Sequence, residues 1–408
     1  MGWHVFVVDA DSYPVHRDRL FCGVKNPRKE SRRRNRGTGA MTPTLNTALY
    51  GLYADLKALR VGDIVFFYQM RKEEEKHDRG FRGMFKVKSE PFFDDSNIDG
   101  VAGSTVGLGS DGKKVLGKCP HCNSSLSDKS DDDGALVCQN CGQRVDFHIL
   151  PNRVIIEPVS FFLNKTSHLE AVIDDNTAYI DRNYIKDNLP VLWTMLFRKT
   201  YGAGRERSIT HILPDEARKL EYIFNDLFDK GRLGHIVPYV KPSTATPIVI
   251  PLDCDAEGEL KIEALLEAWM MENIDKNVPV LMDIIGNPTE LEYFGNNVLY
   301  GIGGERVDIL CIHKHGSERT RATVIELKKG DLKKVDVEQI NDYTKWMSQL
   351  VFGNDTKASK LKIQPVLIGF SINQKIVQYA KNMITDTQKP ILLKYDIDAG
   401  TVKFTRVL

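Results

Sequence analysis

Residues 322–328 read Ala-Thr-Val-Ile-Glu-Leu-Lys, and this short stretch sets the architecture expected for the C-terminal third of the chain. Its apolar and β-branched residues predict a strand, in which alternation puts Glu326 and Lys328 on one face. A second predicted strand, Arg306-Val-Asp308-Ile-Leu-Cys-Ile, also carries a carboxylate inside an apolar run. A buried carboxylate costs several kcal/mol unless a cation or hydrogen bonds compensate it, so the two strands together indicate a shared ion.

Mg²⁺, or Mn²⁺ in its place, is the ion expected at Asp308 and Glu326, because it binds a few carboxylates together with waters and phosphate oxygens. Hydrolysis of a phosphodiester requires carboxylates that hold such cations, a metal-activated water and a positive charge near the phosphate. Lys328 is expected to orient that water or to stabilise the charge that develops on the phosphate.

Around these residues the sequence resembles the PD-(D/E)xK nucleases, in their RecB-like and NucS-like branch, over about residues 255–408. The motifs are Glu263 on a predicted amphipathic helix, Arg306-Val-Asp308, Ile325-Glu326-Leu-Lys328 and Gln339-x3-Tyr343. The resemblance implies a restriction-endonuclease-like α/β domain with a central mixed sheet. It also implies that Asp308 and Glu326 hold the metal, that Lys328 is catalytic, that Glu263 adds a carboxylate, and that Gln339 and Tyr343 line the site. A surface strand with an ion pair is the alternative interpretation of the Glu-x-Lys motif.

Four cysteines form two pairs, Cys119-x2-Cys122 and Cys138-x2-Cys141, separated by fifteen residues. Two tight turns can then each offer two thiolates to one tetrahedral ion, so the spacing predicts structural Zn²⁺. The pattern resembles a zinc ribbon, inserted at about residues 115–145. Four unmetallated thiols are the alternative.

The N-terminal region alternates short apolar runs with polar turns, as in Val5-Phe-Val-Val8 and Ile64-Val-Phe-Phe-Tyr68, and predicts a small curved sheet or barrel. Helical spacing follows at residues 184–230. Four prolines between residues 236 and 257 prevent regular helix and predict an extended linker. We therefore expect domains at residues 1–235 and 258–408.

This first domain resembles, less specifically, the EVE and PUA-like fold over about residues 1–160, apart from the cysteine segment. The resemblance rests on the opening strand Trp3-His-Val-Phe-Val-Val, Gly62-Asp-x-Val-x-Phe-Tyr68, Gly83-x-Phe-x-Val and Arg153-Val-x-Ile-Glu157-Pro. Members of this fold group often bind nucleic acid, and some hold a flipped, modified base in an aromatic pocket. Ordinary core packing is the alternative interpretation of each aromatic residue.

Basic residues expected to contact nucleic acid fall in two places. Lys329 and Lys333 follow the Glu-x-Lys strand and either contact backbone phosphates or belong to a solvated turn. The second place is a basic arm, which either tracks phosphates or is a solvated loop; its residues are Arg28, Lys29, Arg32, Arg33, Arg34 and Arg36.

The chain as a whole is nearly neutral, with 56 basic and 55 acidic side chains, which argues against a protein that coats nucleic acid by bulk attraction. The first twenty residues contain no continuous apolar h-region of the kind found in signal peptides, and no later stretch reaches the roughly 18 apolar residues of a membrane span. The expected location is the cytoplasm, with no membrane partner.

The sequence therefore predicts a multidomain α+β and α/β protein. Its N-terminal domain is expected to recognise nucleic acid (the reader), and its C-terminal domain is expected to cleave it (the cutter). The favoured function is a Mg²⁺-dependent DNA endonuclease of restriction or defence type, acting on duplex DNA and selecting a sequence or a modified base. The alternatives are a repair nuclease for mismatched, branched or single-stranded DNA, and a non-catalytic DNA- or RNA-binding protein. A homodimer would allow a two-strand cut, because one centre cuts one strand.

Overall fold

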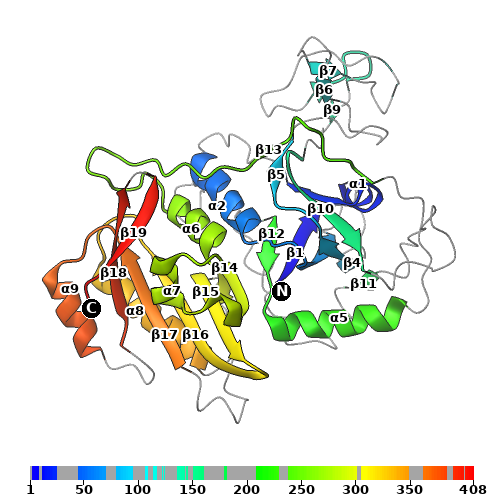
Figure 1. Ribbon diagram of the computed structural model, residues 1–408. Helices are drawn as coiled ribbons and strands as arrows, with labels where there is room; N and C mark the ends of the chain where they lie inside the picture. The colour runs from blue at the N-terminus through cyan, green and yellow to red at the C-terminus, as the bar shows by residue number, and fades with distance from the viewer. Residues whose placement is uncertain are drawn as a thin grey trace.

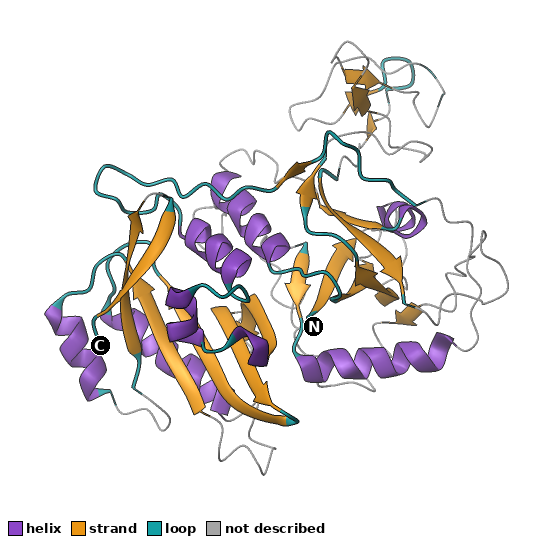
Figure 2. Ribbon diagram, viewed as in Figure 1, coloured by secondary structure: helices purple, strands orange, loops and turns teal. Residues whose placement is uncertain are grey.

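The computed structural model contains two mixed sheets with helices around them (Figures 1 and 2), which confirms the α+β class. Seven α-helices lie in the described ranges. The structure describes residues 2–8, 12–24, 45–69, 80–94, 106–108, 114–116, 122, 124, 136–142, 144–145, 150–159, 179–181, 208–228, 238–300, 305–348, 362–383, 389–398 and 400–408.

The first sheet is built mainly from the N-terminal half, with the strand order β12-β1-β3-β4-β10-β5-β13, while β11 pairs with β4 and β2 with β10. Only β1 and β3 pair in parallel among these strands. The strands are β1 (Trp3–Val8), β2 (Phe21–Val24), β3 (Ile64–Gln69), β4 (Gly80–Val87), β5 (Phe92–Phe93), β10 (Asn152–Pro158), β11 (Tyr179–Asp181), β12 (Ile209–His211) and β13 (Thr246–Pro247). The helices of this half are α1 (Ser12–Arg19), α2 (Leu45–Lys57) and α5 (Pro214–Phe228).

The aromatic residues of this half form its core. Trp3, Tyr13, Phe66 and Phe67 are all buried, and Tyr13 and Phe85 pack edge-on against Phe67. Core packing is therefore the role that the structure gives them.

One element differs from the sequence prediction. Ile209–His211 forms strand β12, antiparallel to β1, inside the range 184–230 that we expected to be helical. A three-residue strand is too short to show a period of its own, and its pairing with β1 comes from a distant part of the chain. Helix α5 lies in the same range and begins with Pro214, followed by Asp215 and Glu216 in its first turn, as a helix N-terminus favours.

The second sheet has six strands in sequence order and is mixed. β14 to β16 are antiparallel, β16 to β18 are parallel, and β19 returns antiparallel to β18. The strands are β14 (Leu291–Tyr300), β15 (Glu305–His315), β16 (Glu318–Leu327), β17 (Lys362–Gly369), β18 (Ile391–Asp398) and β19 (Thr401–Arg406).

Helices cover both faces of the second sheet (Figure 1). Helices α6 (Glu263–Asn273) and α7 (Pro279–Ile285) pack on the face that carries Ile309 and Ile325. Helices α8 (Lys334–Trp346) and α9 (Gln374–Asn382) pack on the opposite face, with Leu310 and Val324. Asp308, Glu326 and Lys328 alternate with the first set and so belong to the α8 side.

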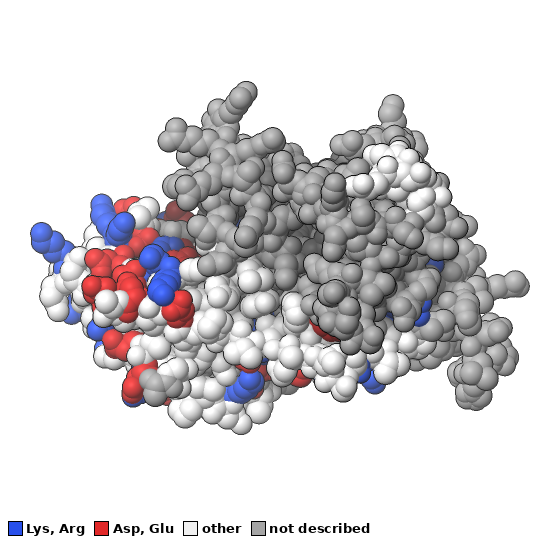
Figure 3. Space-filling view, turned by 90° about the horizontal axis from the view of Figure 1, so that it is seen from above, with Lys and Arg blue, Asp and Glu red and all other residues white. Residues whose placement is uncertain are grey.

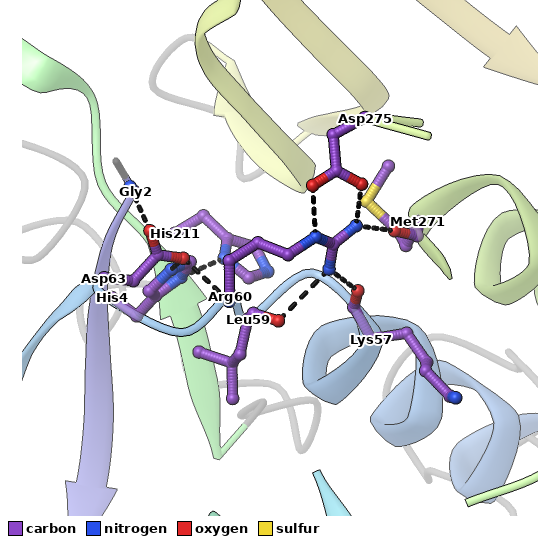
Figure 4. A network of polar contacts seen from close by, with 9 residues as sticks. All are labelled: Gly2, His4, Lys57, Leu59, Arg60, Asp63, His211, Met271 and Asp275. Atoms are coloured by element: carbon purple, nitrogen blue, oxygen red, sulfur yellow. Dashed lines mark hydrogen bonds and ion pairs between the residues drawn. The ribbon is translucent and has the colours of Figure 1, made fainter. Parts of the chain in front are cut away.

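The two halves share a packed interface. Helix α2 packs along α6, and its Ala54 and Ala58 are part of the apolar core around α6. The Arg60 guanidinium, just after α2, donates to both carboxylate oxygens of Asp275 and to the carbonyl oxygen of Met271 (Figure 4). The Arg60 backbone N–H donates to Asp63, which also accepts from His4. This arginine therefore connects the first sheet to the end of α6.

Two further contacts cross the same interface. The Asn296 side chain of β14 donates to Asp55 of α2 at 2.9 Å and to Glu267 of α6 at 2.6 Å. Near the start of α5, Arg319 of β16 pairs with Asp215. Among the described residues no helix is both long enough and apolar enough to cross a membrane.

Candidate active site

The pairing of β15 with β16 brings Asp308 and Glu326 together. Ile309 pairs with Ile325 in this antiparallel register, so the next residue on each strand is Asp308 and Glu326. The Leu327 backbone N–H donates to Asp308 Oδ2 at 2.7 Å and fixes that carboxylate at the end of the pairing. Two residues that are 18 positions apart in the sequence thus share one end of the sheet.

Lys328 and Glu263 complete a cluster of four charged groups. Lys328 Nζ forms an ion pair with Glu326 Oε1, and its backbone N–H donates to Ile368 of β17. Glu263 is the first residue of α6, and its Oε2 accepts from the Lys329 backbone N–H at 3.0 Å. The cluster therefore combines residues from α6, β15 and the end of β16.

The carboxylates of this cluster are protonated more easily than usual. Burial, together with the neighbouring Glu326 and Glu263, raises the pKa of Asp308 well above its ordinary value. Burial also raises the pKa of Glu326 to about 7, although Lys328 acts against this shift. Burial lowers the pKa of Lys328, but the charges of Glu326 and Asp308 more than reverse that effect and keep the ammonium protonated. The cluster therefore places like charges close together in a buried environment.

One carboxylate oxygen of the cluster has no donor. Glu326 is 1% exposed, and its Oε2 meets no hydrogen-bond donor in the part of the chain that the structure describes. A buried acceptor left unpaired is costly, and it lies here next to two further carboxylates. Carboxylate oxygens are the ligands that Mg²⁺ and Mn²⁺ prefer. In the described part of the chain, however, three oxygens of this cluster do not all lie within 4.8 Å of one another, as the ligand atoms of a preformed three-residue metal site would.

Gln339 and Tyr343 lie one helical turn apart on α8. Gln339 Nε2 donates to the Tyr343 hydroxyl, which in turn donates to the Arg306 carbonyl oxygen at 2.7 Å. Tyr343 is buried and attaches α8 to β15 two residues before Asp308. The structure thus brings both residues to the strand that carries Asp308.

Asp336 is a carboxylate that the sequence interpretation did not include. It is buried in the first turn of α8, accepts from the Lys333 backbone N–H at 2.7 Å, and raises the pKa of both Glu263 and Glu326 in addition to the effect of burial. The available signal was its place three residues after the helix cap, where an acidic residue favours a helix start.

The rim next to the cluster is acidic. Lys329 Nζ lies 3.2 Å from Glu259 Oε1, so its charge is partly neutralised. Glu259 belongs to the loop that also exposes Asp253, Asp255 and Glu257, and acidic side chains gather on this side of the molecule (Figure 3). Lys333 is exposed at the start of α8. The predicted basic arm, Arg28 to Arg36, lies outside the described residues.

Three of the four paired cysteines form a separate cluster. The Sγ atoms of Cys122, Cys138 and Cys141 lie within 4.8 Å of one another, which suits a metal ion such as zinc. The Gly142 backbone N–H closes a turn onto the Cys138 carbonyl oxygen, and its φ of +69° is one that glycine adopts readily. Cys119 lies outside the described residues.

Comparisons with known proteins find only low similarity. No protein-family model matches the chain, and no curated protein matches it. Several solved structures match at low similarity, among them the following three. A protein from Pseudomonas putida is 11% identical, with 54% of this chain and 99% of that chain covered and a TM-score of 0.26. The human THYN1 protein in complex with DNA containing 5-methylcytosine is 12% identical, with 56% and 98% covered and a TM-score of 0.23. A hypothetical protein from Leishmania major is 10% identical, with 55% and 96% covered and a TM-score of 0.26. Similarity at this level assigns no family and no function.

Proposed function

We propose that this chain is a metal-dependent endodeoxyribonuclease whose C-terminal half cuts DNA that its N-terminal half selects. The observation that carries the proposal is the buried Glu326 Oε2, which has no donor among the described residues and lies in a cluster with Asp308, Glu263 and Lys328. A cluster of buried like charges with an unpaired oxygen is expected where a cation binds.

The topology of the second half supports this proposal. A helix that carries Glu263, three antiparallel strands, helix α8 and the parallel strand β17 follow one another along the chain. We infer a restriction-endonuclease-like α/β domain of the PD-(D/E)xK kind. Asp308 and Glu326 then lie at adjacent strand ends, and Tyr343 fastens α8 behind them.

Each charged residue has a distinct role in this proposal. Asp308 and Glu326 hold the cation, with Glu263 at the start of α6 as a further carboxylate close to them. A bound Mg²⁺ would supply a water of lowered pKa and positive charge for the phosphate. Lys328, whose side chain is 26% exposed, keeps its ammonium beside Glu326 and can orient the water or stabilise the charge on the phosphate.

We further propose that the first half is an EVE or PUA-like reader, and that the cysteine cluster holds a structural zinc ion. The reader would select a sequence or a modified base, in a restriction or defence enzyme. THYN1 was solved with DNA containing 5-methylcytosine, and methylated duplex therefore belongs among the substrates to be tried. Contacts with α6 fix the position of this half relative to the cutter.

The test is cleavage of unmodified, cytosine-methylated and branched DNA by the purified full chain, with Mg²⁺ or with a chelator. Asp308→Asn and Lys328→Met should each reduce cleavage by about 100- to 1000-fold, since each removes a charge that acts in the transition state. Asp342→Asn and Lys403→Met, which change exposed residues of α8 and β19, are the matched controls and should cleave normally.

The substrate preference separates the remaining possibilities. Preferential cutting of duplex DNA supports a restriction enzyme, whereas preferential cutting of branched DNA would indicate repair. Binding of DNA without cleavage under any of these conditions would contradict the proposed nuclease activity and would support a non-catalytic binding protein. Sedimentation of the same samples would report whether the active species is a homodimer.

A further inference from the structure

A second pair of incompletely satisfied groups lies at the opposite end of β15 and β16. His313 and Arg321 are cross-strand neighbours near the hairpin between these strands. His313 is 2% exposed, and within the described residues neither ring nitrogen has a hydrogen-bond partner. Five residues separate His313 from Asp308, which corresponds to about 16 Å along a strand. The pair is therefore distinct from the metal cluster.

Arg321 is a half-buried cation without an acidic partner. Its Nη2 donates to the Ile284 carbonyl oxygen, and no carboxylate of the described ranges forms an ion pair with it. Its cross-strand neighbour His313 adds two unpaired nitrogens to the same place. The absence of a counter-ion beside a partly buried guanidinium is unusual, because buried charges in proteins are normally paired.

The two side chains converge at Gly286, which ends α7. A Cβ at Gly286 would stand 3.3 Å from Arg321 Nη1 and 3.5 Å from His313 Nε2. Gly286 has φ +115°, a backbone conformation that is strained for any residue with a side chain, so glycine suits this position. Both Gly286 and Arg321 are half-exposed, so the pair lies next to the protein surface.

The charges around His313 favour an anion over a cation. Burial, and then the charge of Arg321, lower the pKa of His313 to about 4, so the ring is neutral at pH 7 and can donate one N–H. Burial raises the pKa of Cys311, on the same strand face, and the thiol remains uncharged. Glu290 is the acidic group that faces His313, and its effect on that pKa is smaller than the effect of Arg321. A metal ion would meet the repulsion of the guanidinium.

We propose that His313 and Arg321 form a binding site for a phosphate-type oxyanion at the Gly286 end of α7. Guanidinium and imidazole N–H groups are strong donors to phosphate oxygens. The occupant is either free phosphate or a phosphate of the DNA backbone, and only the second source rests on the proposed nuclease function. A bound anion would satisfy the guanidinium and a ring nitrogen together.

The experiment measures the melting temperature of the metal-free full chain against inorganic phosphate, at an ionic strength held constant with sodium chloride. The wild-type melting temperature should rise saturably by about 2–5 °C. Arg321→Gln and His313→Gln should abolish the rise. His315→Gln and Lys314→Gln change exposed residues of the same hairpin and should respond like wild type. No rise in the wild type, or an equal rise in all variants, would overturn the proposal.

A second measurement needs no variant and covers the case in which Arg321→Gln fails to fold. The ring proton signals of His313, followed by nuclear magnetic resonance, should shift on phosphate addition, and its pKa should rise because a bound anion favours the protonated ring. Unchanged His313 signals at saturating phosphate would contradict the site.

Binding of a short duplex identifies the source of the anion. If Arg321→Gln lowers the slope of log affinity against log salt by about one, the occupant is a backbone phosphate. If DNA affinity is unchanged while the phosphate response is lost, the occupant is free phosphate. The phosphate response does not depend on cleavage, so failure of the nuclease proposal would leave this result intact.

Discussion

Helix α6 carries two glutamates with opposite surroundings. Glu267, in the middle of the helix, is buried at the interface and accepts from the side chains of Asn296 and Asn297. Glu263, at the first residue, lies in a cluster where burial and neighbouring carboxylates raise the pKa of Asp308 and Glu326, and where Glu326 Oε2 has no donor among the described residues. One helix therefore carries a glutamate whose carboxylate has donors and a second glutamate whose cluster contains an acceptor without a donor among the described residues.

This difference in hydrogen bonding distinguishes a structural role for Glu267 from a ligand-binding role for the cluster around Glu263. At the interface these acidic side chains have donors: Asp275 accepts from Arg60, Glu292 of β14 accepts from Arg218 of α5, and Asp55 accepts from Asn296. Removing one partner of such a buried pair strongly destabilises the protein. The Asp308 cluster is compensated only in part, because Glu326 Oε2 has no donor among the described residues and the carboxylates crowd one another, so we expect it to lower stability unless a ligand is bound. Substitutions in the two places should therefore change stability in opposite directions.

Asn296→Ala should have the largest destabilising effect at the interface. It removes the donor that Asp55 and Glu267 share in a buried place, and we expect the free energy of unfolding to fall by about 3 kcal/mol. Chemical denaturation measures this change, with Asn382→Ala on the exposed face of α9 as the control. A loss as small as that of the control would mean that the interface does not hold the two halves.

Arg60→Met should destabilise by about 2 kcal/mol, because the methionine keeps the apolar part of the side chain but loses the donors to Asp275 and Met271. Calorimetry should also show the single unfolding transition separating into two, since Arg60 links the halves. Arg406→Met, at an exposed position on β19, serves as the control. A single unchanged transition in Arg60→Met would contradict this role.

Asp63 should contribute a smaller, pH-dependent effect. Burial would raise its pKa, but hydrogen bonds from His4 and from the Gly2 and Arg60 backbones lower it below the ordinary value. Because the pKa of Asp63 is lower in the folded protein, its contribution to the free energy of unfolding is complete above the unfolded pKa of about 4. This contribution is lost as the pH falls through the folded pKa. Asp63→Asn should therefore cost about 1 kcal/mol at pH 7 and less near pH 2. A difference from wild type that stays constant over this range would exclude the mechanism.

Local periodicity accounts for part of the C-terminal cluster. Strand alternation places Glu326 and Lys328 on one face, and the apolar runs on both strands fix a register in which Asp308 meets Glu326. Whether these residues catalyse hydrolysis remains a prediction. The predicted strands also indicate a central sheet in the second half, whereas its mixed character is an expectation from the family resemblance.

Contacts between distant segments could not be predicted in this way. Arg60 and Asp275 are 215 positions apart, and nothing in either local sequence indicates the other. Ala54 and Ala58 read as part of the first half, yet they pack in the second core. The pairing of His313 with Arg321 depends on a register that is irregular at the next residue, Lys314. Each of these features depends on tertiary packing.

The most direct test of the account is the melting temperature of the wild type and of Asp308→Asn, each with and without Mg²⁺. Without metal, Asp308→Asn should be more stable than wild type by about 1 kcal/mol, because one of several crowded carboxylates has been neutralised. Mg²⁺ at a hundred times its Kd should stabilise the wild type by about 2.7 kcal/mol and leave the variant unchanged. A destabilised variant, together with a wild type that does not respond to Mg²⁺, would show that the cluster is a structural ion-pair network.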